Sequence, residues 1–181
     1  VTDFLNYDRN NVIVVRVDAT QYEGWFYEGA GIYRHVWLNS YPNTHIATDG
    51  VFAYANINGN KATLNVETTV ANEYTAAGNY SINTYLTDRS GVKISAAKET
   101  SLTLSTNEEK TIRQIVNVTN PTLWSLENPY LYRVVVELKL NGKVVDSKKL
   151  RFGFRTIEIK PNGIFLNGKQ IKILGTNNHQ D

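Results

Sequence analysis

The sequence predicts an all-β protein centred on an immunoglobulin-like antiparallel β-sandwich. Apolar and polar residues alternate in residues 62–70, 80–86 and 132–140, as they do in strands that bury one face. Turn residues separate these stretches, and no amphipathic helix pattern falls between about residues 42 and 159. Seven or so short strands joined by such turns are typical of an antiparallel sandwich.

Each alternating stretch has one mainly apolar face. Because successive side chains of a strand point to opposite sides of the sheet, we expect these faces to be buried. The faces consist of Ala62, Leu64, Val66, Thr68 and Val70, then Tyr80, Ile82, Thr84 and Leu86, and finally Tyr132, Val134, Val136, Leu138 and Leu140.

Asparagine and glycine mark the hairpins. Asn58-Gly59-Asn60 precedes the strand that begins at Ala62, and Asn141-Gly142 separates the strand of residues 132–140 from residues 143–152. Both residue types tolerate the positive φ of tight hairpin turns. These connections are therefore predicted to be antiparallel, with further turns at Ser90-Gly91 and Thr106-Asn107.

The two ends of the chain do not fit the sandwich. Residues 11–18 and 32–38 are rich in apolar residues and are predicted strands, but two strands cannot bury such faces alone. We expect them to close a preceding all-β domain. Near the other end, residues 164–166 and 171–174 flank Asn167-Gly168 in a hairpin-like pattern, and we expect the protein to continue beyond Asp181.

Composition excludes several classes of function. The 19 Lys and Arg residues against 17 Asp and Glu give a formal charge of +2 and are scattered along the chain, so no nucleic-acid or membrane partner is predicted. The absence of cysteine removes disulfides, thiolate zinc sites and cysteine nucleophiles. No apolar stretch approaches the roughly 20 residues that cross a bilayer, and the first residues lack the features of a signal peptide. No cofactor and no metal site are predicted.

Four segments carry a resemblance to a known family. Together, and in this order, they resemble the β-galactosidase and β-glucuronidase group of glycoside hydrolases, family 2. The segments are Gly29-Ala30-Gly31-Ile32-Tyr33-Arg34-His35-Val36-Trp37-Leu38, Trp124-Ser125-Leu126-Glu127-Asn128-Pro129-Tyr130-Leu131-Tyr132, Phe152-Gly153-Phe154-Arg155 and Gly175-Thr176-Asn177-Asn178-His179.

The resemblance implies a three-domain order of jelly roll, immunoglobulin-like sandwich and catalytic (β/α)₈ barrel. Residues 1–41 would end the jelly roll, 42–159 would form the sandwich and 160–181 would begin the barrel. The family hydrolyses glycosides with retention through two glutamates, which need a separation of roughly 5 to 5.5 Å. Both glutamates would lie on barrel strands beyond residue 181, so this chain alone is expected to be inactive and to contain no catalytic residue.

The resemblance also implies the partners of the parent enzyme. They are a β-galactoside or related carbohydrate and, within the protein, the flanking jelly-roll and barrel domains. The segment of residues 29–38 favours a galactosidase over a glucuronidase or mannosidase. The family's bacterial members suggest a periplasmic or secreted location.

His179 is the one site residue that the resemblance supplies. Gly175, Asn177 and His179 match the family pattern at the end of the first barrel strand, where barrel enzymes place their active sites. The match implies that His179 binds the sugar in the parent enzyme, since an imidazole can donate a hydrogen bond to a hydroxyl. In the 181-residue chain the alternative is a frayed terminal tail. Asn178 and Asp181 receive no role.

The loop of residues 22–28 has two interpretations. Its aromatic side chains could stack on sugar rings, with Glu23 or Glu28 reaching the sugar, or they could pack between domains. Packing is at least as well supported by the sequence. The aromatic residues are Tyr22, Trp25, Phe26 and Tyr27.

The sandwich itself shows no legible site. A carbohydrate patch at Trp124, Pro129, Tyr130 and Tyr132 is one interpretation, but core or corner packing is favoured. Carboxylates and histidines do not cluster between residues 42 and 159: Glu108-Glu109 is a turn-adjacent pair and His45 is alone. The alternative to a glycosidase fragment is a stand-alone carbohydrate-binding or adhesion module of immunoglobulin-like fold.

Overall fold

The computed structural model describes residues 1–18 and 31–177. The chain divides into two units, one comprising Val1–Asn39 with Leu174–Asp181 and the other Ser40–Ile173. All strands of the described residues lie in the second unit. In the part of the chain that the structure describes, no helix has the length and apolar character needed to cross a membrane.

The strands follow one another with short connections. They are β1 (Thr44–Asn58), β2 (Lys61–Asn72), β3 (Gly78–Thr87), β4 (Lys93–Ala96), β5 (Thr100–Leu104), β6 (Glu108–Thr119), β7 (Tyr132–Leu140), β8 (Lys143–Phe152), β9 (Ile157–Lys160), β10 (Gly163–Leu166) and β11 (Lys169–Ile171). A 3₁₀ turn, η1 (Thr2–Phe4), precedes them.

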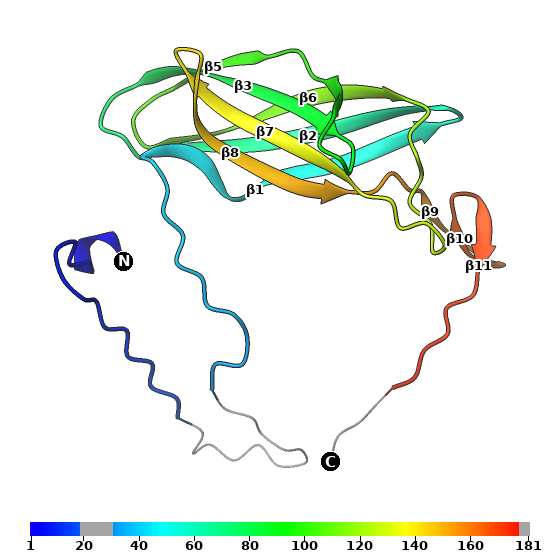
Figure 1. The fold of residues 1–181 in the computed structure, drawn as a ribbon, viewed down its shortest axis with the longest axis horizontal. Coiled ribbons are helices and arrows are strands. Elements are labelled where there is room, and N and C mark those ends of the chain that lie inside the picture. Colours follow the sequence, from blue (N-terminus) through cyan, green and yellow to red (C-terminus); the bar gives the residue numbers. More distant parts are fainter. Residues whose placement is uncertain (19–30, 178–181) are drawn as a thin grey trace. The chain divides into compact units, whose positions relative to one another are not determined.

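The strands form three antiparallel sheets, two of which face each other. The β1 sheet has the order β1-β2-β6, and the β3 sheet has the order β4-β3-β7-β8 with β5 also paired to β3. Figure 1 shows these two sheets as the layers of a sandwich. The third, which we call the terminal sheet, has the order β11-β10-β9. The predicted all-β antiparallel sandwich is confirmed.

The alternation seen in the sequence decides which side chains fill the sandwich. The apolar faces of β2, β3 and β7 point between the layers, and on β2 all five predicted residues are at most 2% exposed. Burying one such aliphatic side chain is worth about 1.5–3 kcal/mol. The core consists of Ile46, Ala62, Leu64, Val66, Val70, Ile82, Leu86, Leu102, Leu104, Val116, Val118, Tyr132, Val134, Val136, Leu138 and Phe154.

The predicted turns are present. Asn141 and Gly142 have φ of 51° and 76°, and Asn167 and Gly168 have 50° and 77°; two consecutive positive φ values are those of a type I′ hairpin turn. Gly59 also has a positive φ, of 56°, between the antiparallel strands β1 and β2. Gly91 and Asn107 show the same feature in the other two predicted turns.

The strands predicted near the N-terminus are wrong. Residues 11–18 and 32–38 form no strand, and their apolar side chains are exposed, with Ile13 81% and Trp37 77% accessible. The local sequence favours an extended strand, but backbone groups need partner strands to complete a sheet. The described residues of this unit offer none.

The predicted hairpin around Asn167-Gly168 is confirmed as β10 and β11. The sequence did not separate β9 from the sandwich strands, but β9 pairs with β10 in the terminal sheet, with Ile159 opposite Ile164. This sheet belongs with the sandwich to the unit Ser40–Ile173. The assignment of residues 1–41 and 160–181 to neighbouring domains stays a prediction.

Candidate functional site

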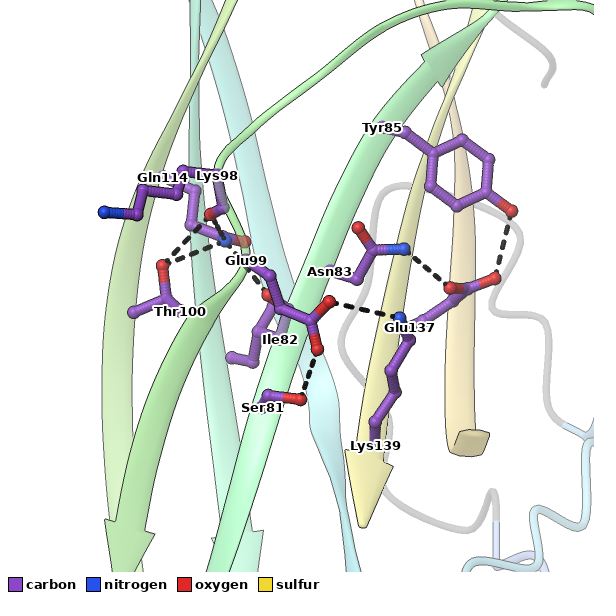
Figure 2. A network of polar contacts seen from close by, with 10 residues as sticks. All are labelled: Ser81, Ile82, Asn83, Tyr85, Lys98, Glu99, Thr100, Gln114, Glu137 and Lys139. Atoms are coloured by element: carbon purple, nitrogen blue, oxygen red, sulfur yellow. Dashed lines mark hydrogen bonds and ion pairs between the residues drawn. The ribbon is translucent and has the colours of Figure 1, made fainter. Parts of the chain in front are cut away.

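A network of polar side chains covers part of the β3 sheet (Figure 2). Glu137 on β7 accepts hydrogen bonds from Asn83 Nδ2 at 2.8 Å and from the Tyr85 hydroxyl at 3.0 Å. Glu99, in the connection before β5, accepts one from the Ser81 hydroxyl at 2.5 Å. Its second carboxylate oxygen lies 3.3 Å from Lys139 Nζ. Two carboxylates are thus present on one sheet, each with two polar partners.

The chemistry of this network opposes a role in acid catalysis. The hydrogen bond from Ser81, and next that from Lys139, hold the pKa of Glu99 below its ordinary value. A glycosidase general acid needs the opposite, a raised pKa that keeps the proton on the carboxyl group. Burial, followed by the hydrogen bond to Glu137, raises the pKa of Tyr85, so its hydroxyl stays a donor. The network joins neighbouring strands rather than moving protons.

Sequence reasoning missed this network. Alternation alone puts Asn83, Tyr85 and Glu137 on polar faces of their strands, because the buried residues lie between them. Alternation does not predict which strands pair. The pairing of β3 with β7, which places Asn83 opposite Glu137, is known only from the structure.

The segment around Trp124 is a corner of the fold. The Trp124 backbone N–H donates to the Phe154 carbonyl at 2.8 Å, and the Tyr132 hydroxyl accepts from the Thr122 N–H at 2.8 Å. The Tyr132 ring lies 4.8 Å from that of Tyr130 and meets the edge of Phe154 at 5.2 Å, measured between centroids. The predicted structural role is confirmed.

Gly153 packs closely against Trp124 in this corner. A Cβ added at Gly153 would lie 3.0 Å from Trp124 Cβ and 3.2 Å from two atoms of its indole ring. Two of the segments that carried the family resemblance therefore pack against each other. The guanidinium carbon of Arg155 also lies over the Trp124 ring, 5.1 Å from its centroid.

Asn167 joins the terminal sheet to this corner. Its Oδ1 accepts from the Thr156 N–H at 3.0 Å, and its Nδ2 donates to the Trp124 carbonyl at 2.9 Å. Its own backbone N–H donates to the Thr156 carbonyl at 2.9 Å. One turn residue thus ties the hairpin of β10 and β11 to the chain that leaves the sandwich. We call these three bonds the Asn167 clasp.

The isolated titratable residues have structural partners. His45 is 7% exposed, stacks on Tyr41 with 4.8 Å between ring centroids, and places Nδ1 2.9 Å from the Pro42 carbonyl oxygen. Glu108 accepts the Ser105 N–H, which lowers its pKa, and so it caps the turn before β6. Among residues 1–18 and 31–177, no three His, Cys, Asp or Glu side chains are grouped to hold a metal ion.

The predicted sugar-binding residue His179 lies outside the described residues, as do Asn178 and Asp181. The same is true of the loop of residues 22–28 with Glu23 and Glu28. The structure describes Gly175 and Asn177 of the family pattern, both exposed and outside any strand. These site residues stay predictions.

Relatives of the chain cover its whole length. It is 33% identical to the protein named beta-galactosidase BoGH2A of Bacteroides ovatus over 100% of this chain and 22% of that protein. It is 31% identical to a beta-galactosidase of Thermoanaerobacter pseudethanolicus over 99% of this chain and 25% of that protein. The chain thus spans about a quarter or less of the length of these relatives.

Solved structures share the fold. A glycosyl hydrolase family 2 member from Bacteroides cellulosilyticus has a TM-score of 0.69 and 32% identity, over 73% of this chain and 18% of that one. A beta-glucuronidase of Bacteroides uniformis has a TM-score of 0.71 and 26% identity, over 78% of this chain and 18% of that one. The family described as "Glycosyl hydrolases family 2" matches residues 44–155, which are the sandwich strands and the Trp124 corner. The chain therefore belongs to glycosyl hydrolases family 2.

Proposed function

We propose that this chain is the central, non-catalytic part of a retaining glycoside hydrolase that cleaves β-galactosides. The observation that carries the proposal is the alignment of the entire chain with beta-galactosidase BoGH2A, of which it spans 22%. The catalytic glutamates of this proposal belong to a barrel that follows residue 181. The substrate is a terminal β-glycosidic bond, and the preference for galactose is supported by the segment of residues 29–38 and by the relatives named beta-galactosidase.

The proposed role of the sandwich is to fix the orientation of the domains on either side. The Asn167 clasp supports this role, because three hydrogen bonds hold the chain that leaves the sandwich. Exposed apolar residues near both ends of the chain are consistent with contacts to neighbouring domains. Examples are Ile13, Trp37 and Leu174, which are 81%, 77% and 82% accessible. Large exposed apolar surface marks interaction sites. In this proposal residues 1–41 end a jelly roll and residues 160–181 begin the barrel.

His179 is the proposed sugar-binding residue of the parent enzyme. Its support is the match of Gly175, Asn177 and His179 to the family pattern at the end of a barrel strand. For the loop of residues 22–28 we propose packing between domains, with contact to the sugar through Glu23 or Glu28 as the alternative.

Hydrolysis of chromogenic β-galactoside, β-glucuronide and β-mannoside substrates tests the proposal. The 181-residue chain and the full-length protein are assayed side by side. We expect activity in the full-length protein only, with the β-galactoside cleaved best. Activity in the 181-residue chain would contradict the placement of the catalytic glutamates and direct attention to Glu23 and Glu28.

One observation favours the second candidate, a carbohydrate-binding module. Phe52 and Tyr54 on β1 are 61% and 41% exposed, and their ring centroids lie 5.6 Å apart. Exposed aromatic faces are surfaces on which sugar rings stack. The encoding gene separates the two candidates, since a barrel adds about 250 residues after the sandwich. A natural stop codon directly after Asp181 would favour the binding module.

A further inference from the structure

Three arginines surround one cavity at the edge of the sandwich. Arg89 follows β3, Arg133 lies in β7 and Arg151 in β8, and all three are exposed. They line a cavity of about 360 Å³, within the range of roughly 300–1,000 Å³ that is usual for small-molecule sites. Arg133 and Arg151 are direct partners across the two strands.

The charge of this cluster has no counterpart in the described residues. None of the carboxylates of residues 1–18 and 31–177 forms an ion pair with these arginines. Asp88, beside Arg89 in the chain, instead accepts the backbone N–H groups of Ser90 and Val92 at 2.8 and 2.9 Å. Like charges directly opposite each other on paired strands are destabilising. An anion between Arg133 and Arg151 would remove that cost.

Arg89 is oriented by an aromatic ring. Its guanidinium carbon lies 4.1 Å from the centroid of the Tyr130 ring, a cation–π contact. A cation–π contact of this kind does not consume the hydrogen bonds that a guanidinium can donate. Tyr130 is itself held by the corner, through its contact with Tyr132. One of the three cations thus has an aromatic partner beside the cavity.

The rest of the lining favours an organic anion over an inorganic one. Pro129 and Leu131 supply apolar surface, and Asn128 supplies an amide. Inorganic sulfate or phosphate gains nothing from apolar walls, whereas a sugar acid has C–H faces, hydroxyls and a carboxylate. The planar guanidinium binds a carboxylate through two parallel hydrogen bonds. We propose that this arginine pocket binds a carboxylated saccharide, a uronic acid residue.

This site is independent of the catalytic proposal, because every residue that carries it belongs to the sandwich. If the arginine pocket bound no saccharide, the proposed β-galactoside hydrolysis would not be affected. If the full-length protein hydrolysed no β-galactoside, the proposed binding at the pocket would not be affected.

Isothermal titration of the full-length protein tests the pocket with a galacturonate oligosaccharide, a neutral galactose oligosaccharide and sodium sulfate. The variants are Arg133→Gln with Arg151→Gln, and separately Arg89→Gln. Arg113→Gln is the matched control, because Arg113 is an exposed arginine of the β1 sheet that pairs with Glu67. Thermal unfolding of each variant checks that it is folded.

We expect saturable binding of the galacturonate oligosaccharide. Its affinity should fall about tenfold or more in each of the two arginine variants, because each variant loses at least one charge-assisted bidentate contact. Arg113→Gln binds like the unaltered protein, and added salt weakens binding. Equal binding of the neutral oligosaccharide, unchanged binding in both arginine variants, or no saturable binding would each overturn the proposal. Sulfate binding as tightly as the oligosaccharide would overturn the assignment to a saccharide.

Discussion

At the scale of single residues, the buried side chain of Gln114 forms hydrogen bonds to the β3 sheet near its edge. It is 4% exposed, and its Oε1 accepts the Thr84 hydroxyl at 2.6 Å. Its Nε2 lies 3.1 Å from the Ile82 carbonyl and 2.9 Å from that of Lys98. At this point β3 changes partners, since residues 78–82 pair with β5 and residues 85–87 with β4. Gln114 reaches across from the β1 sheet to satisfy backbone groups at the change.

We predict that Gln114→Leu destabilises the chain by about 2–4 kcal/mol, because leucine leaves the Thr84 hydroxyl and the Ile82 carbonyl buried without this partner. Thr111→Val on the same strand is the control, since the Thr69–Thr111 hydroxyl contact is exposed. We expect the control to change stability by less than about 0.5 kcal/mol. Urea unfolding measures both, and equal effects would contradict the role of Gln114.

At the scale of elements, the sequence contains the strands and their turns but not all of their partners. Period-two alternation identified β2, β3 and β7 because one face of each is buried, and the Asn141-Gly142 turn could be predicted because few residues tolerate its positive φ. The change of partner along β3, from β5 to β4, could not be predicted from alternation. It occurs where Gln114 of β6 bonds to the Ile82 carbonyl. Residues 11–18 have the composition of a strand but no partner strand among the described residues. Composition alone does not reveal whether a partner strand is present.

We predict that Gly142→Ala destabilises the chain by about 1–2 kcal/mol, the cost of a side chain in the left-handed region. Gly142 has φ of +76° and open space where a Cβ would lie, so backbone strain is the only expected effect. Gly175→Ala is matched, because its added Cβ also meets nothing and its φ is not positive. The midpoint of thermal unfolding should fall for Gly142→Ala and stay nearly constant for Gly175→Ala.

At the scale of the whole molecule, the candidate site was predicted only as far as the family pattern reaches. His179 follows from its match with Gly175 and Asn177, but no alternation or spacing in the chain would have selected it. The arginine pocket was not predicted at all. Arg89, Arg133 and Arg151 are far apart in the sequence, and only the pairing of β3, β7 and β8 brings them to one cavity.

The Asn167 clasp links local hydrogen bonds to the proposed function of the whole enzyme. We predict that Asn167→Gly, which keeps the backbone free to adopt φ of +50° and removes both side-chain bonds, destabilises the 181-residue chain by about 1–3 kcal/mol. Asn141→Gly is the control, since Asn141 has φ of 51° in the same kind of turn and makes no side-chain hydrogen bond within the described residues.

In the full-length enzyme, Asn167→Gly should lower kcat/KM for the chromogenic β-galactoside several-fold, because small misplacements of a catalytic site are costly and the clasp holds the chain that leads to the proposed barrel. The comparison is made well below the unfolding midpoint, so that both proteins are folded. Asn141→Gly should leave kcat/KM unchanged. A loss of stability without a loss of kcat/KM would show that the clasp supports the sandwich alone, and that the orientation of the barrel is fixed by other contacts.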